Sequence, residues 1–348
     1  MRDLSLQQIK RWTQRTAIIA VAVAVTVTLA ITWLWRDRVA LDDITWPPYP
    51  FIEPRIDAVT MTWLGTTTIL FDDGETQVLI DGFFSRPSIF DVVLQRPVSS
   101  DAANINYVMD EYRMRRLAAI IPVHSHWDHA FDVGAIANRS SASIVGSEST
   151  ANIARGAGVP EDQIVAIESG AEYTFGNFTV TMIESPHGPV GWGGSVPMAG
   201  TIDVPLEQPA PVQAYREGRS YSIVVAHPHG TTLVQGSGGF TESALDDVAA
   251  DVVMLGVGLV EGLGRDYVEK YWQAVVTSTG ARHVFPIHFD DPTRPFGDVI
   301  PYPRVLGNFL TTSRWLEEIR DTWDVDTRLH LPEFGKTLIL YPLEGPEA

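Results

Sequence analysis

The stretch Leu117–Asn138 reads LAAIIPVHSHWDHAFDVGAIAN and carries the clearest structural signal in the chain. It begins with a continuous apolar run, Leu117–Val123, which is typical of a buried strand. At His124 the pattern changes to a cluster of polar side chains, and the apolar spacing over Asp128–Asn138 predicts a helix. The sequence therefore predicts a strand, a short loop and a helix that meet at one group of His and Asp side chains.

The loop between this strand and this helix offers four side chains that can bind a metal ion. In extended backbone, His124 and His126 lie at positions i and i+2 and point to the same side. Asp128 and His129 open the helix and face back toward them. The chain contains no cysteine, so a metal ion would be held by His and carboxylate alone. We therefore predict a metal site built on these four residues.

The His-x-His-x-Asp-His form of His124–His129 resembles the signature of the metallo-β-lactamase superfamily. Asp81 in LIDGFFSRP is similar to that superfamily's earlier Asp motif, and WLGTTTILF and DGFFSRPS look most like the subgroup of ascorbate phosphate lactonases and N-acyl phosphatidylethanolamine phospholipase D enzymes. The resemblance covers about Ala58–Pro342. It implies an α/β (α+β) fold, a four-layer αββα sandwich of two mixed β-sheets flanked by helices.

The resemblance also implies two further His ligands, His187 in ESPHGP and His288 in FPIHFDD, each at a strand end. The implied ligand sets are His124, His126 and His187 for a first metal ion, and Asp128, His129 and His288 for a second. Asp81 would bind no metal ion itself, but it would accept hydrogen bonds that orient the loop with the histidines.

One position departs from the superfamily pattern. After the predicted strand Thr231–Gln235, where an Asp usually bridges both metal ions, the chain carries Ser237 between two glycines. A hydroxyl is neutral and a weak ligand, so a second cation would lose a bridge and a compensating charge. The sequence leaves open a site with one ion, or a site completed by Asp290 or Asp291, which follow His288 closely. A solvated turn is the alternative for these two aspartates.

The donor set favours a hydrolase that uses a divalent metal ion, with one or two zinc ions expected first and manganese or iron as alternatives. A bound metal ion lowers the pKa of its water from about 15.7 to about 7. Asp128 would orient that water toward an ester, a lactone or a phosphodiester. Two alternatives stay open: a mononuclear non-haem iron oxidoreductase similar to persulfide dioxygenases, and a non-catalytic binding protein.

Residues 188–219 form a long segment rich in Gly and Pro, and we predict that they cap the active site, because long loops in compact domains are usually functional or disordered. Trp192 and Met198 would make this cap apolar. An apolar cap near a membrane fits a lipid-like substrate, and a small soluble lactone or phosphoester fits equally well.

The N-terminal segment is of a different kind. Residues 16–35, TAIIAVAVAVTVTLAITWLW, carry no charge, and at helical rise they reach about 30 Å, the thickness of a hydrocarbon core. We predict a transmembrane helix over 16–35, a linker over 36–57 and a catalytic domain over 58–342. Residues 1–15 would be a cytoplasmic tail, since basic residues stay inside, and the catalytic domain would lie outside the cytoplasm. A cleaved signal peptide is the alternative. The basic residues of the tail are Arg2, Lys10, Arg11 and Arg15, against Asp3.

The net charge of −18 argues against a nucleic-acid partner, because phosphate binding needs a clustered basic surface. The expected partners are therefore the membrane and a small-molecule or lipid-like substrate, and the oligomeric state is left open. His227 and His229 flank a Pro at a predicted hairpin tip, where a solvent-exposed turn is expected. His330 lies near the last predicted strand, and the sequence names no partner for it.

Overall fold

The structure, a computed structural model, describes residues 6–49, 58–167 and 169–341, with side chains in the first helix described from Lys10 onward. Outside these residues lie the predictions for Arg2, Asp3, the end of the linker from residue 50, and Pro342. Within them, the elements differ from the predicted ones mainly at their ends.

The domain is built on two mixed sheets of seven strands each. The strands of the first sheet are β1 (Val59–Trp63), β2 (Ile69–Asp72), β3 (Gln77–Ile80), β4 (Leu117–Ile121), β5 (Ser143–Gly146), β6 (Ile164–Ala166) and β14 (Thr337–Tyr341). The strands of the second sheet are β7 (Glu172–Phe175), β8 (Phe178–Glu184), β9 (Tyr221–His227), β10 (Gly230–Gln235), β11 (Val252–Gly256), β12 (His283–Ile287) and β13 (Arg328–Leu329). The orders are β14-β1-β2-β3-β4-β5-β6 and β13-β12-β11-β10-β9-β8-β7.

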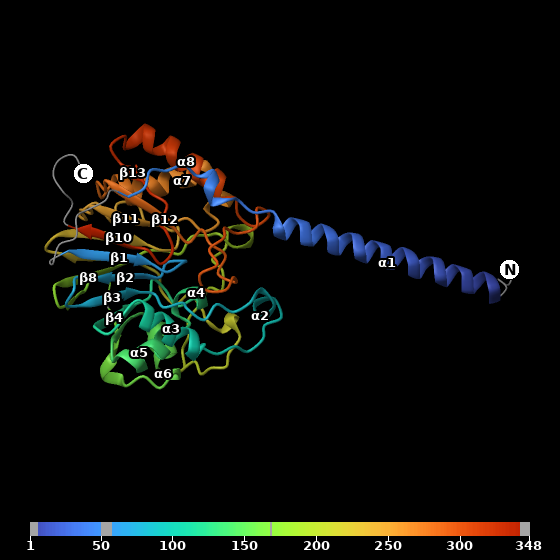
Figure 1. The fold of residues 1–348 in the computed structure, drawn as a ribbon, viewed down its shortest axis with the longest axis horizontal. Coiled ribbons are helices and arrows are strands. Elements are labelled where there is room, and N and C mark those ends of the chain that lie inside the picture. The colour runs from blue at the N-terminus through green and yellow to red at the C-terminus, as the bar shows by residue number, and fades with distance from the viewer. Residues whose placement is uncertain (1–5, 50–57, 168, 342–348) are drawn as a thin grey trace.

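Helices cover the outer face of each sheet (Figure 1). The helices are α1 (Leu6–Arg36), α2 (Ile89–Val93), α3 (Ala102–Glu111), α4 (Trp127–Ala130), α5 (Val133–Ser140), α6 (Glu148–Gly156), α7 (Arg265–Trp272) and α8 (Phe309–Trp323). Helices α3, α5 and α6 lie on the first sheet, and α7 and α8 lie on the second. The predicted four-layer αββα sandwich is confirmed.

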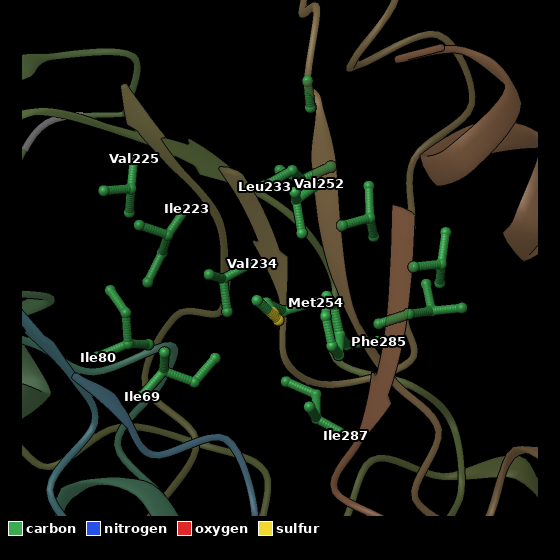
Figure 2. Packing of buried hydrophobic residues seen from close by; sticks show 14 of the residues in the cluster. Ile69, Ile80, Ile223, Val225, Leu233, Val234, Val252, Met254, Phe285 and Ile287 are labelled. Atoms are coloured by element: carbon green, nitrogen blue, oxygen red, sulfur yellow. The ribbon is translucent and has the colours of Figure 1, made fainter. Parts of the chain in front are cut away.

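Strand alternation divides the apolar side chains of the first sheet between two cores. Val78 and Ile80 of β3 belong to the core between the sheets, while Leu79 belongs to the core beneath the helices. Figure 2 shows Ile80 of the first sheet near Ile223 of the second. Both faces of β3 are therefore buried, which explains a continuous apolar run in place of an alternating one.

The helix predicted over Asp128–Asn138 is two helices, α4 and α5, with Asp132 between them. The carboxylate of Asp132 accepts hydrogen bonds from the backbone N–H groups of Phe84 and Ser85, both at 2.7 Å. These bonds fix the loop after β3 against the start of α5. The break therefore comes from a tertiary contact that no local pattern reveals.

The apolar spacing over Arg304–Arg320 predicts a helix, but α8 begins only at Phe309. The residues before it are fixed by other segments: the N–H of Arg304 donates to the carbonyl of Asp37 at 2.8 Å, and the N–H of Asn308 donates to Glu261 Oε1 at 2.6 Å. These bonds hold the chain in a turn where the apolar pattern alone favours a helix.

The hairpin tip with His227 and His229 joins β9 to β10 as predicted, but the predicted exposure is wrong for His227. Its side chain is only 6% exposed, and its Nε2 lies 3.6 Å from Asp73 Oδ2 in the turn between β2 and β3. The tip therefore packs on the neighbouring sheet.

Helix α1 leaves the domain and projects away from it (Figure 1). It begins earlier than the predicted apolar run, and its part from Lys10 to Arg36 is long and apolar enough to cross a membrane. None of the apolar window within it is buried against the domain.

Candidate metal centre

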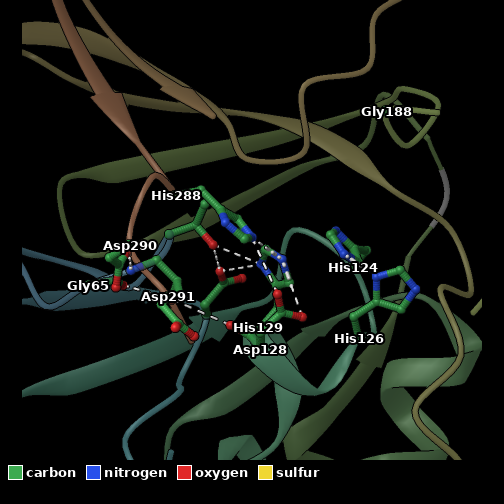
Figure 3. Close-up of polar contacts among 12 residues, drawn as sticks. Gly65, His124, His126, Asp128, His129, Gly188, His288, Asp290 and Asp291 are labelled. Atoms are coloured by element: carbon green, nitrogen blue, oxygen red, sulfur yellow. Dashed lines mark hydrogen bonds and ion pairs between the residues drawn. The ribbon is translucent and has the colours of Figure 1, made fainter. Parts of the chain in front are cut away.

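The predicted ligands converge where several strands end. The loop after β4 carries His124 and His126, β8 leads to His187, and β12 leads directly to His288. Figure 3 shows His124 and His126 beside each other, and Asp128, His129 and His288 as a neighbouring cluster. Segments that are far apart in the sequence thus form one site.

The first group consists of His124, His126 and His187, whose potential ligand atoms all lie within 4.8 Å of one another. His124 Nε2 and His126 Nδ1 are 2.8 Å apart. His187 Nδ1 lies 2.7 Å from the carbonyl of Gly188, so that Nε2 is the nitrogen left to bind a metal ion. Burial and the neighbouring histidines lower the pKa of His126 to about 3, and burial lowers the pKa of His187 to about 4. Both imidazoles are therefore neutral at pH 7, as a ligand must be.

The second group consists of Asp128, His129 and His288, again with ligand atoms within 4.8 Å of one another. His288 Nε2 lies 3.4 Å from Asp128 Oδ2 and 3.3 Å from His129 Nε2. Burial by itself would raise the pKa of Asp128, but His129 and His288 outweigh it and hold that pKa well below its usual range. The group therefore offers one carboxylate and two imidazoles.

Asp81 lies next to the second group and holds His129 in place through its carboxylate. Its carboxylate contacts His129 Nδ1 at 2.7 Å and accepts hydrogen bonds from the N–H of Val123 at 2.8 Å and from the hydroxyl of Thr67. With Nδ1 engaged, His129 presents Nε2 to Asp128 and His288. Asp81 adopts a left-handed backbone with φ of 58°, an unusual conformation for a residue other than Gly that clusters at functional sites.

A cavity of about 110 Å³ opens directly onto the two groups. Side chains from both groups line it, together with Met198, Ser237, Leu259 and Tyr302. A donor set of five imidazoles and one carboxylate around such a cavity fits a divalent transition metal ion, because these are the ligand types that zinc and iron take in proteins.

Comparison with known proteins gives a partial match in sequence and a broader match in structure. No protein-family model matches the chain. A UPF0173 metal-dependent hydrolase from Roseiflexus sp. (strain RS-1) is 30% identical over 130 residues, which cover 37% of this chain and 47% of that protein. The chain thus spans about half the length of the curated relatives it matches.

Among solved structures, the diiron β-hydroxylase CmlA from Streptomyces venezuelae has a TM-score of 0.51 at 13% identity, covering 83% of this chain and 55% of that one. The metallo-beta-lactamase fold protein YhfI from Bacillus subtilis has a TM-score of 0.49 at 14% identity, covering 81% and 98%. The two mixed sheets with helices on their outer faces have the architecture of the metallo-β-lactamase fold, and CmlA shares the fold over most of this chain. At such low identity the likeness concerns the fold alone, and the predicted lactonase and phospholipase subgroup stays a prediction.

Ser237 stands at the position where metallo-β-lactamase fold enzymes are expected to carry a bridging Asp. It follows β10 and lines the cavity, and its carbonyl accepts a hydrogen bond from the N–H of Gly188 at 3.0 Å. Among the described residues that line the cavity, Asp128 is the one carboxylate. The departure that the sequence predicts is therefore present in the site.

Asp290 and Asp291 belong to neither group of candidate ligands. Asp290 lies 3.3 Å from the buried guanidinium of Arg86 and accepts the N–H of Thr66 at 2.8 Å. Asp291 lies 2.8 Å from Arg38. Figure 3 shows both carboxylates beside the second group, on the side away from His124. Nothing in this geometry supports either as a substitute ligand, and their buried ion pairs also differ from the expected solvated turn.

The predicted cap divides into two parts. Met198 lines the cavity, whereas the side chain of Trp192 is 99% exposed and does not. Further along, Val212 and Tyr215 are fully buried in the core beneath the helices. Only the first part of residues 188–219 therefore adjoins the cavity, and the second part belongs to the body of the domain.

Three residues of the site were not predicted from the sequence. Thr67 lies 2.8 Å from His129 Nδ1, Tyr302 lines the cavity, and Gly258 adjoins His288 so closely that a Cβ there would lie 2.9 Å from its carbonyl oxygen. All three are brought to the site by loops that local patterns do not place. Of the three, Gly258 alone offers a weak hint in the sequence, because a glycine soon after a strand end can mark a close approach of the backbone to a site.

Proposed function

We propose that this chain is a metal-dependent hydrolase of the metallo-β-lactamase fold that attacks an ester, a lactone or a phosphodiester. One observation carries the proposal: two groups of three ligand side chains lie next to each other and share one cavity. The partial match to UPF0173 metal-dependent hydrolases supports the same class of reaction.

His124, His126 and His187 would hold one metal ion, and Asp128, His129 and His288 a second. Zinc is the first expectation, since neutral imidazole and carboxylate suit it, and manganese and iron are the alternatives. Without an Asp at position 237, the second group has a single negative charge to balance a divalent cation. We therefore expect the second group to bind its ion more weakly than the first.

When bound, the metal ion supplies Lewis acidity and a water of lowered pKa. The residues of the chain do the rest. Asp128 faces the cavity as a carboxylate and can accept a hydrogen bond from the attacking water, which orients it toward the substrate. Burial raises the pKa of Tyr302 well above its usual value, so its hydroxyl stays protonated and can donate a hydrogen bond to a developing oxyanion.

We propose further that α1 is a membrane anchor, with the N-terminus in the cytoplasm and the domain on the other side. The length and composition of α1 and its lack of burial support this role, and the basic residues before the apolar run support the orientation. Removal of α1 as a signal peptide is the alternative. A membrane location favours a lipid-like substrate over a small soluble ester.

The same donor set also suits a single non-haem iron ion, and an iron oxidoreductase is therefore the second candidate. Metal analysis separates the two. The full chain is purified in detergent without chelator, its metal content is measured by inductively coupled plasma mass spectrometry, and hydrolysis of a panel of esters, lactones and phosphodiesters is assayed. Zinc or manganese with hydrolysis supports the proposal. One iron per chain with oxygen uptake would replace it by the second candidate, and a metal-loaded chain without turnover would indicate a binding protein.

A further inference from the structure

We infer that the face of the domain around the cavity mouth rests against the lipid bilayer and inserts apolar side chains into it. We call this face the bilayer-facing surface and define it by Phe90, Val93, Leu94, Trp192, Val305 and Leu306. The inference rests on the proposed anchor in one respect, that α1 crosses a membrane.

Helix α1 joins the domain without a spacer. Helix α1 ends at Arg36, and Asp37 is already held by Arg304, through a backbone hydrogen bond of 2.8 Å and an ion pair of 3.3 Å. Arg38 then donates to the carbonyl of Pro301 at 2.6 Å and pairs with Asp291 at 2.8 Å. Two residues span at most about 7 Å. The segment around Pro301–Arg304 must therefore lie at the membrane surface when α1 is inserted.

Apolar side chains follow this segment immediately. Val305 and Leu306 are 56% and 50% exposed, although they come directly after Arg304. Large apolar side chains in such a position find no cover within the described part of the chain. A bilayer surface a few ångströms away would remove them from water, which is favourable in proportion to the apolar area covered.

A second loop that lines the cavity carries Trp192. Val190 and Pro197 of this loop line the cavity, and the turn between them is closed by a hydrogen bond of 2.8 Å from Gly191 to Ser195. The turn holds Trp192 at its tip with 99% of its side chain exposed. Tryptophan is the residue type most typical of the membrane interface, because its ring is apolar and its N–H can remain in water.

Helix α2 adds a third apolar element. Phe90, Val93 and Leu94 are exposed at 67%, 67% and 56%; Phe90 and Val93 are three residues apart on one face of the helix, and Leu94 follows directly after its end. Figure 1 shows α2 on the side of the domain from which α1 extends. Three separate elements, namely α2, the Trp192 loop and the segment after Arg304, therefore carry uncovered apolar side chains, and exposed apolar side chains of this kind mark an interaction site.

Charge decides how this surface would bind. With a net charge of −18 the chain is repelled by anionic lipids, so the contact must come from apolar insertion and not from a basic patch. The cavity is lined both by Val190 and Pro197 of the Trp192 loop and by Tyr302, which neighbours the residues held by Arg38, so that with α1 inserted the cavity lies close to the bilayer surface. An amphiphilic substrate could place its polar group at the metal centre while its apolar part stays in the lipid.

The chain contains no cysteine, so single cysteines can be introduced and labelled without a background. We would reconstitute the full chain into phosphatidylcholine vesicles as Phe90→Cys, Trp192→Cys and Leu306→Cys variants, each carrying a polarity-sensitive fluorophore. Val325→Cys is the matched control: Val325 is 75% exposed and comes shortly before β13, a strand that Figure 1 shows on the side of the domain away from α1. We expect a blue shift and several-fold stronger quenching by lipid-attached quenchers at positions 90, 192 and 306 than at position 325.

Equal, water-like signals at all four positions, in protein that floats with the vesicles, would overturn the inference and leave the anchor intact. Protein that does not float with vesicles would overturn both. Hydrolysis of a soluble ester, measured on the same samples, tests the catalytic part of the proposed function independently, because none of the labelled positions lines the cavity.

Discussion

Asp128 has two roles in the proposed reaction, as a metal ligand and as the group that orients the attacking water. It belongs to the second group of ligands, and it lines the cavity as a carboxylate whose pKa is well below the usual range. Asp128→Asn keeps the size of the side chain and removes its charge. We expect turnover to fall by about 100-fold or more, the usual contribution of a positioned acid or base. The measurement is kcat together with metal content. A variant with full activity and full metal content would show that Asp128 neither binds metal nor orients the water.

Gly258 allows a sharper test of the second group, since the methyl of Gly258→Ala would lie 2.9 Å from the carbonyl oxygen of His288 and 3.0 Å from its Nδ1. His288 would have to shift, and metal bound at the second group should fall while the first group keeps its ion. Gly262→Ala is the matched control, because a Cβ there meets nothing within 4 Å. Isothermal titration calorimetry with the metal ion measures the affinity of the second group in both variants. Equal affinities in both variants would mean that the position of His288 does not matter.

At the level of elements, the edge between β12 and β13 holds a buried pair of histidines. His283 Nδ1 and His330 Nε2 are 2.9 Å apart, and His330 Nδ1 lies 3.1 Å from the carbonyl of Pro47. The ring of Tyr49 packs at 5.2 Å against both imidazoles. The described part of the linker thus closes over this edge, and His330 has the partner that the sequence does not name.

Burial lowers the pKa of both His283 and His330 to about 4, with a contribution from the neighbouring cations. In an unfolded chain the same groups titrate near about 6.5. Between these values the unfolded chain binds more protons than the folded chain, so the free energy of unfolding rises with pH. The contribution of the two histidines to this free energy is lost as the pH falls from about 6.5 to about 4. We expect His283→Gln to reduce the slope of stability against pH in this window. Chemical denaturation at several pH values measures it, and identical slopes for the variant and the parent chain would contradict the assignment.

Secondary-structure elements were easier to predict from the sequence than the contacts between them. Strand β4 lies almost where the apolar run Leu117–Val123 places it, because burial of both its faces selects a continuous run of apolar residues. The break at Asp132 and the late start of α8 were missed, since each depends on hydrogen bonds to a segment far away in the sequence.

At the scale of the whole molecule, the apolar part of α1 packs against none of the described residues of the domain. The helix can therefore be removed without uncovering the core of the domain. A chain that begins at Asp37 keeps the contacts of Asp37 and Arg38 with the domain. We expect it to stay folded, with a free energy of unfolding within about 0.5 kcal/mol of the full chain, as for other changes of exposed residues. Turnover of a soluble ester should be unchanged, while flotation with vesicles should be lost. Flotation of the shortened chain at the level of the full chain would place the anchor elsewhere.

The spacing of His124, His126, Asp128 and His129 was sufficient to predict a metal site, because residues so close in sequence are placed by backbone stereochemistry alone. The role of α1 as a candidate membrane span likewise follows from composition and length. Packing between distant segments was needed to bring His187 and His288 to that site, since each comes from a different strand of the second sheet. The same packing directs Asp290 and Asp291 to arginines, leaves Trp192 exposed and brings the segment with Tyr302, which lines the cavity, to the residues that follow α1. Such contacts depend on how two sheets and their loops fit together, and no local pattern encodes that fit.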